Sequence, residues 1–270
     1  VDGTQQVVTV TINGANDAPL ISNLGTSDGK VNFLVSDVDN STLTLNSTFA
    51  HAFGDPVMSS GTSVDLAPTE QSTSISGMLQ VTDGSNSVSV LGVSIGTSSG
   101  ETLTATSVGG TNVLYGFGGA DTLVGSTGND TFVGGLSADV LTGGGGVNTF
   151  VINASDSVGV VGGYGNSGTI SGYDTIKDFN IGVDTLNLVG TVVASISATN
   201  NHSTLTISGH AINSSAITNG VISFDDANKF SKPLVINSTS AIAAAVQYLE
   251  SNDIGGVNAV VAFQASLGSV

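Results

Sequence analysis

Oxygen-bearing side chains recur every nine residues in the glycine-rich middle of the chain, and they have the chemistry of cation ligands. Five consecutive units cover residues 107–151 and read SVGGTNVLY, GFGGADTLV, GSTGNDTFV, GGLSADVLT and GGGGVNTFV. The sixth position of the units holds Asn112, Asp121, Asp130, Asp139 and Asn148. Carboxylate and carbonyl oxygens are hard ligands, which suit calcium and not zinc. The repeated side chains are therefore of the type that binds a hard cation.

The same units contain the elements that must position those ligands. Their eighth position is always a large apolar residue, namely Leu114, Leu123, Phe132, Leu141 and Phe150. Glycines let the first half of each unit turn through backbone conformations closed to other residues. The last three residues then form a short strand with its apolar side chain pointing inward. A flexible glycine-rich linker would lack both columns.

Together the columns resemble the pattern G-G-x-G-x-D-x-U-x, with U a large apolar residue, of the calcium-binding nonapeptide in RTX proteins. The resemblance implies a parallel β-roll with two units, or eighteen residues, in each turn. Calcium would lie between adjacent turns, so three ligand pairs arise: Asn112 with Asp130, Asp130 with Asn148, and Asp121 with Asp139. The last pair has two carboxylates and is expected to bind most strongly. Backbone carbonyls of the glycine turns would complete the sites, with Gly116, Gly119, Gly125, Gly128 and Gly134 as candidates.

A second acidic segment, YDTIKDFNIGVDTLNL at residues 173–188, resembles the segment that closes RTX β-rolls. The resemblance implies that some of its acids bind calcium and that its aromatic residue, Phe179, caps the roll. We expect Asp174 to be a ligand in preference to Asp178, and Asp184 to be a turn former.

The N-terminal third of the chain indicates β-structure. Residues 1–19 resemble the closing strand and NDAP linker of a VCBS or cadherin-like repeat, in which an acid such as Asp17 often binds calcium. Short β-branched runs within residues 20–100 predict an Ig or cadherin-like β-sandwich. Asp37 and Asp39 resemble the paired acids of such repeats and could bind calcium, but a solvated turn is an equally good interpretation.

The C-terminal part resembles the targeting region of type I secretion substrates. Residues 191–270 are β-rich, and AIAAAVQYLE, preceded by Thr239 or Ser240 as a cap, predicts one helix. The expected fold class is therefore all-β, with a sandwich (20–100), a β-roll with its closing segment (101–190) and a β-rich end with one helix (191–270).

The amino-acid composition disfavours several classes of binding partner. The 270 residues include four Lys, no Arg and no Cys, and the formal net charge is −17. This charge disfavours nucleic acid and anionic membranes as partners. Because the chain cannot form disulfides, a bound metal is the obvious substitute for them in an extracellular protein. No apolar run reaches the length of a membrane span, and no signal peptide is visible. Val1 falls within an expected strand, so we expect this sequence to be part of a longer protein.

Two enzyme motifs occur, and neither has the required context. Residues 96–100 match G-x-S-x-G, but a nucleophile elbow needs a strand before it and a helix after it. Residues 163–168 match G-x-G-x-x-G without a surrounding βαβ unit. His51, His202 and His210 stand outside any zinc pattern. We therefore expect that the protein is not an enzyme.

The resemblances imply an extracellular, calcium-dependent section of a secreted bacterial surface adhesin. Such a section would fold on calcium after export by the type I secretion machinery, and its further partners would be cell-surface or self-assembly partners. One alternative is a self-assembling surface-layer or sheath protein. Another is the secretion tail of an RTX protease or lipase, although a cadherin-like strand ahead of the roll disfavours a preceding catalytic domain.

Overall fold

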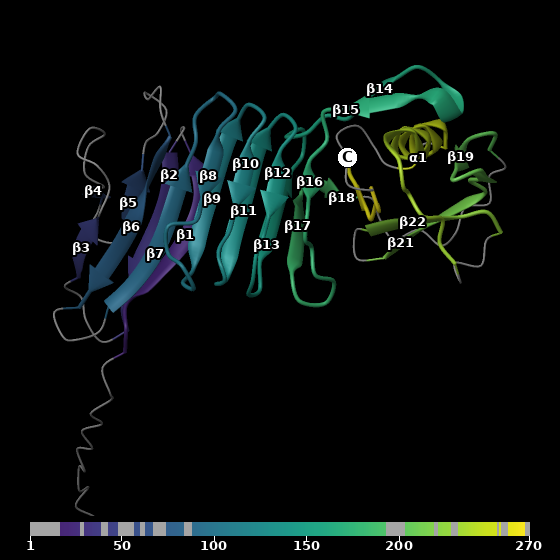
Figure 1. Cartoon of the computed structure of the whole chain (residues 1–270). Helices are drawn as coiled ribbons and strands as arrows, with labels where there is room; N and C mark the ends of the chain where they lie inside the picture. Colours follow the sequence, from purple (N-terminus) through teal and green to yellow (C-terminus); the bar gives the residue numbers. More distant parts are fainter. Residues whose placement is uncertain are drawn as a thin grey trace, which may run out of the picture.

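The computed structural model shows β-sheets in succession along the chain, followed by a unit that contains one helix (Figure 1). It describes residues 17–27, 30–38, 43–47, 57–59, 63–66, 74–83, 88–192, 203–218, 221–227, 232–252, 254 and 259–267. The expected strand within residues 1–12 and the candidate ligand Asp39 lie outside these ranges.

Two facing sheets form the N-terminal sandwich. One sheet has the order β1 (Leu20–Ser27), β2 (Lys30–Ser36), β5 (Ser63–Leu66), β4 (Val57–Ser59). The other begins with β3 (Thr44–Ser47), β6 (Ile75–Thr82) and β7 (Val88–Ile95), and both are antiparallel here. Burial alternates along β6, as expected for a sheet with one covered face. The core between the sheets includes Val31, Phe33, Val35, Leu79, Val81 and Val93.

The nonapeptide units form a parallel β-roll. One wall contains β9 (Asn112–Gly118), β11 (Asp130–Leu136), β13 (Thr149–Asn153) and β17 (Thr185–Val189). The opposite wall contains β8 (Thr102–Thr104), β10 (Thr122–Val124), β12 (Val140–Thr142) and β16 (Thr175–Ile176). The pairing register stacks each apolar column, so Leu123 faces Leu141 and Phe132 faces Phe150. These side chains are fully buried, and the rings of Phe132 and Phe150 stack with centroids 5.0 Å apart.

The sandwich and the roll share one sheet. Strand β7 pairs with β9 in parallel, so a seven-stranded sheet runs in the order β17-β13-β11-β9-β7-β6-β3 (Figure 1). In this register Ser94 of β7 lies beside Leu114, at the place of the large apolar residue, and its hydroxyl donates to the carbonyl of Thr104 at 2.8 Å. The last strand of the sandwich is thus also the first strand of the roll wall.

The segment between β13 and β16, which lies inside the roll sequence, packs on the C-terminal unit. It forms a hairpin of β14 (Val160–Gly162) and β15 (Thr169–Ser171) around a short 3-10 helix, Gly165–Ser167. Its Gly165 N–H donates to Gln247 Oε1 at 2.9 Å, and Ile170 and Tyr173 pack on the C-terminal core. Residues 82 positions apart in the chain are thereby joined.

The C-terminal unit surrounds helix α1 (Thr239–Ser251). The helix begins after Ser238, whose hydroxyl accepts from the Ala241 N–H, so the cap precedes the expected Thr239 or Ser240. Tyr248 and Leu249 are buried against a sheet core with Phe224. The remaining strands are β18 (Thr191–Val192), β19 (Thr206–Ile207), β20 (His210–Ala211), β21 (Ser214–Thr218), β22 (Val221–Asp225), β23 (Ala259–Val260) and β24 (Ala262–Phe263).

The expected fold class is confirmed: the chain is mostly β with one helix, and the repeat region forms parallel sheets as a β-roll requires. None of the helices described is long and apolar enough to cross a membrane.

Candidate calcium-binding edges

The polar residues of the repeats lie in two rows, at the two edges where the roll walls meet. The strand register brings together residues eighteen positions apart, as the resemblance implied. We name the first row the carboxylate edge; it contains Glu101, Asp121, Asp139 and Asp174. We name the second row the amide edge; it contains Asn112, Asp130, Asn148 and Asp184.

The three aspartates of the first row are each tied to the turn before them by a backbone N–H. Asp121 Oδ1 accepts from the N–H of Glu101 at 2.7 Å. In the same way Asp139 Oδ1 accepts from Asp121 at 2.8 Å, and Asp174 Oδ1 accepts from Asp139 at 2.9 Å. These bonds use one oxygen of each carboxylate and fix the direction of the other.

The second oxygens of two of these carboxylates are orphaned. Oδ2 of Asp121 and Oδ2 of Asp139 are buried and have no hydrogen-bond partner in the described part of the chain, and each residue is only 1% exposed. A Cβ atom added at Gly116 would overlap both with Asp121 Oδ2 and with the carbonyl oxygen of Gly134. Two oxygens from successive turns therefore converge on one point, and a buried acceptor without a partner costs free energy unless a cation is present.

The pKa values along the carboxylate edge also indicate that a cation would stabilise it. Burial raises the pKa of Asp121 to about 6 and that of Asp139 to about 7, and neighbouring carboxylates add to both shifts. Burial also raises the pKa of Asp174, although its hydrogen bonds lower it in part. A positive charge between the turns would reverse these shifts, because an opposite charge favours the ionised form.

Backbone carbonyls must supply most of the remaining ligands. Among the described residues, no three His, Cys, Asp or Glu side chains gather at one point. Calcium takes six to eight oxygens, so a site between turns needs oxygens such as the Gly134 carbonyl. The glycines allow the close approach: Gly119 has φ +90°, and a side chain on Gly128 would overlap with the carbonyl of Gly110 in the turn before.

The amide edge repeats the ladder with different partners. Asn112 Nδ2 donates to Asp130 Oδ1 at 2.7 Å. The N–H of Asp130 donates to Asn148 Oδ1 at 3.1 Å, and the N–H of Asn148 donates to Asp184 Oδ1 at 2.9 Å. Gly125 occupies the place that Gly116 has on the other edge, because its added Cβ would meet Asp130 Oδ2 and the Gly143 carbonyl.

The other candidate ligands lie in different places. Asp174 belongs to the carboxylate edge, whereas Asp178 is exposed and accepts from the N–H groups of Gly143 and Gly144. Asp17 precedes β1 and Asp37 follows β2, so both lie at one end of that hairpin in the sandwich, apart from the two roll edges. The structure therefore assembles the repeat residues with Asp174, and it does not add the sandwich acids to them.

Two residues of the ladders were not predicted as such from the sequence. Glu101 and Asp184 extend the carboxylate and amide edges, and Asp184 also closes a turn by accepting from the Asn180 N–H at 2.8 Å. A signal for both exists in the sequence: each begins an acid-Thr-Leu triplet, as Asp121 does. These two positions share the triplet with Asp121 and lack the glycine pattern before it.

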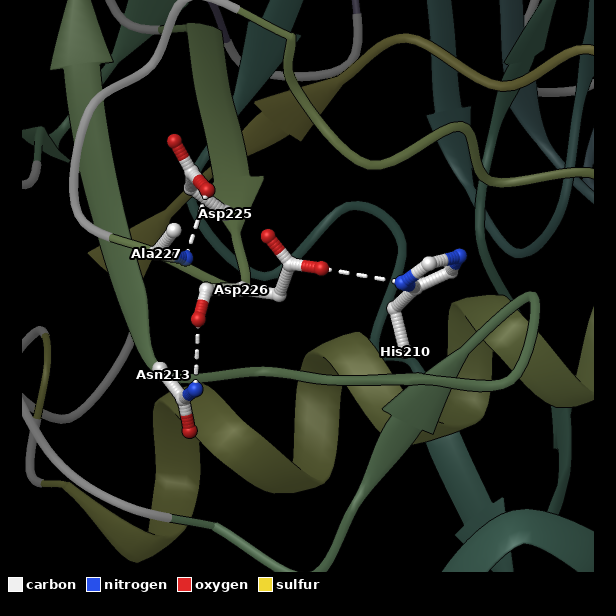
Figure 2. Close-up of polar contacts among 5 residues, drawn as sticks. All are labelled: His210, Asn213, Asp225, Asp226 and Ala227. Atoms are coloured by element: carbon white, nitrogen blue, oxygen red, sulfur yellow. Dashed lines mark hydrogen bonds and ion pairs between the residues drawn. The ribbon is translucent and has the colours of Figure 1, made fainter.

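A separate polar cluster occurs in the C-terminal unit. Figure 2 shows His210 Nδ1 2.9 Å from Asp226 Oδ2, with Asn213 Nδ2 donating to the Asp226 carbonyl at 2.6 Å and the Ala227 N–H donating to Asp225 Oδ1. His210 is 62% exposed, and a solvated pair of this kind contributes about 1 kcal/mol at most. The cluster closes the turn after β22; His51 and His202 lie outside the described residues.

Comparison with known proteins agrees with the geometry. Residues 115–150 match the family model of the RTX calcium-binding nonapeptide repeat, in four copies. No curated protein matches the chain. Residues 115–150 are thus RTX calcium-binding nonapeptide repeats, which bind calcium structurally and imply a calcium-binding segment of a secreted protein.

Proposed function

We propose that the chain is a calcium-dependent structural section of a bacterial surface adhesin, which folds on calcium after type I export. The observation that carries the proposal is the pair of buried, unpartnered carboxylate oxygens of Asp121 and Asp139 inside calcium-binding repeats. The role is structural and not enzymatic.

The negative charge of the chain would keep the roll unfolded during export and allow it to fold once calcium binds. With a net charge of −17 and few cations of its own, the chain has little to offset the burial of carboxylates such as Asp121 and Asp139. At the low calcium level of the cytosol the roll would therefore stay unfolded and exportable. Outside, calcium supplies the missing positive charge, and a site at one hundred times its Kd contributes about 2.7 kcal/mol. Two such sites are comparable to the low end of a domain's stability.

Continuity of the sheet supports a role in transmitting force along a surface protein. Because β7 pairs with β9, the backbone hydrogen bonds of one sheet connect the sandwich to the last turn of the roll. Pulling on the two ends would load a series of parallel strand pairs, and those pairs depend on the buried carboxylate edge. Calcium would thus set the mechanical strength of the section.

Single-molecule force spectroscopy of the 270-residue chain tests this proposal. In millimolar calcium we expect the roll to unfold in a discrete high-force event, and in EDTA we expect it to extend without one. A roll whose unfolding force is the same in both solutions would contradict the proposal. Calcium-induced sheets or filaments in electron micrographs would instead favour the surface-layer alternative, and a protease or lipase domain encoded upstream would favour the secretion-tail alternative.

A further inference from the structure

The two edges of the roll differ in whether their buried oxygens have partners. We propose that calcium binds along the carboxylate edge alone, and that the side-chain amide of Asn112 takes the place of the cation on the amide edge. This inference rests on the proposed calcium-dependent function and adds which ligands the roll uses.

The amide nitrogen of Asn112 lies in a shell of oxygens. Nδ2 donates to Asp130 Oδ1 at 2.7 Å and to the carbonyl of Ser107 at 2.9 Å. The carbonyl of Gly110 and the hydroxyl of Ser126 lie at 3.2 and 3.3 Å. A carboxylate from the next turn and carbonyls from the glycine turn are the groups that a cation would use, and here an N–H₂ group occupies their centre.

The orientation of this amide is fixed by its other atom. Asn112 Oδ1 accepts from the N–H groups of Thr106 and Ser107 at 3.1 and 2.8 Å. Exchanging oxygen and nitrogen would set an N–H₂ group against two N–H donors, so the hydrogen-bond network allows one assignment only. The nitrogen must therefore face Asp130.

The remaining polar atoms of the amide edge are also satisfied. Asp130 Oδ2 accepts from the Ser126 N–H at 2.5 Å, and Asn148 Nδ2 donates to the Gly145 carbonyl at 3.1 Å. Asp184 accepts from the N–H groups of Asn148 and Asn180. Every side-chain oxygen of the amide edge therefore has a hydrogen-bond partner.

The carboxylate edge differs from the amide edge in the hydrogen bonding of its oxygens. The two edges do not differ in burial. Asp121, Asp130 and Asp139 are each 1% exposed and occupy the same position of the nine-residue unit. Among these three, only Asp121 and Asp139 keep an orphaned oxygen, whereas Oδ2 of Asp130 accepts from the Ser126 N–H. The Glu101 carboxylate is already bound by the N–H and hydroxyl of Thr97, so the calcium-dependent part of the edge begins at Asp121. Because Asp121 and Asp139 each have one orphaned oxygen, we expect two calcium ions to bind along this edge.

Native mass spectrometry and isothermal titration of the full chain with calcium chloride test the assignment. We expect Asp139→Asn to lose bound calcium and to weaken the remaining affinity by about tenfold or more, because site charge sets affinity. Its matched control, Asp130→Asn, is expected to bind as many ions as the parent chain. Circular dichroism in saturating calcium identifies any variant that does not fold.

A gain-of-site variant keeps the test decisive even if Asp130→Asn fails to fold. Asn112→Asp replaces the donating amide by a second carboxylate against Asp130, so it is expected to bind one more calcium ion than the parent chain. Equal loss of calcium in Asp130→Asn and Asp139→Asn, or no additional ion in Asn112→Asp, would overturn the inference and leave the proposed function intact. A parent chain that binds no calcium would overturn the proposed function itself.

Discussion

The backbone N–H of Asp121 donates to Oδ1 of Asp139 at 2.8 Å, although the two residues are eighteen positions apart. The bond joins two turns of the roll and holds two carboxylates side by side in a buried place. One oxygen of each is left without a partner. The strand register that makes the roll regular therefore also creates its demand for a cation.

Acidity should act in opposite directions on folding and on calcium binding. In the calcium-free chain the pKa values of Asp121 and Asp139 are about 6 and about 7, above the value of 3.8 for an ordinary Asp. The folded roll therefore holds protons that the unfolded chain has lost, and its stability falls as pH rises from about 4 to about 7. Calcium needs ionised carboxylates, so its affinity rises over the same window.

Hydrogen exchange of β10 and β12 in calcium-free buffer at pH 5 and pH 8 measures the first effect, and calcium titrations at both pH values measure the second. The double variant Asp121→Asn, Asp139→Asn is the control, because it should lose most of both dependences. A parent chain that is more stable at pH 8 than at pH 5 without calcium would contradict the burial argument.

Gly116→Ala should damage the carboxylate edge. The added methyl group would overlap with Asp121 Oδ2 and with the Gly134 carbonyl, and forced overpacking of this kind costs about 1–3 kcal/mol. Gly118→Ala in the same strand is the matched control, since its methyl group would meet Leu136 and Ser98 at ordinary distances of 3.7 and 3.8 Å. Thermal melts in saturating calcium compare the two; equal losses would show that Gly116 has no special place at the edge.

The apolar column should be as necessary as the ligands. Phe150 is fully buried between Phe132 and Phe179, with ring centroids 5.0 and 5.9 Å away. Phe150→Ala is expected to cost about 3–5 kcal/mol. Val147→Ala, at a position that is 51% exposed, should change stability by about 0.5 kcal/mol or less. Denaturant melts in calcium measure both, and a tolerated Phe150→Ala would mean that the column does not hold the turns together.

The roll could be predicted from the sequence because each nine-residue unit contains the residues that determine its local structure. The polar sixth and apolar eighth positions fix which side chains face the edge and which face the interior, and the period fixes the stacking. The helix could also be predicted, since Ile242 and Leu249 belong to an apolar run that a glycine pair follows. Its cap was placed one or two residues too late in the sequence, because Ser238 takes that role.

The junctions of the roll could not be predicted in the same way, because their contacts are long-range. At the start, Ser94 stands where the column has a large apolar residue, so nothing local indicates that β7 belongs to the roll wall. The hairpin at residues 160–171 reads as an irregular insertion. Its partner is Gln247 on a distant helix, and that contact follows from tertiary packing and not from local pattern.

Hydrogen exchange of the whole chain in calcium and in EDTA shows whether the roll needs calcium to fold. We expect the amides of β10 and β12 to be protected in calcium and to exchange quickly in EDTA. Helix α1, whose core is separate from the roll core, serves as the internal control and should be equally protected in both. Protection of β10 and β12 that does not change when calcium is removed would contradict the claim that the roll depends on calcium to fold.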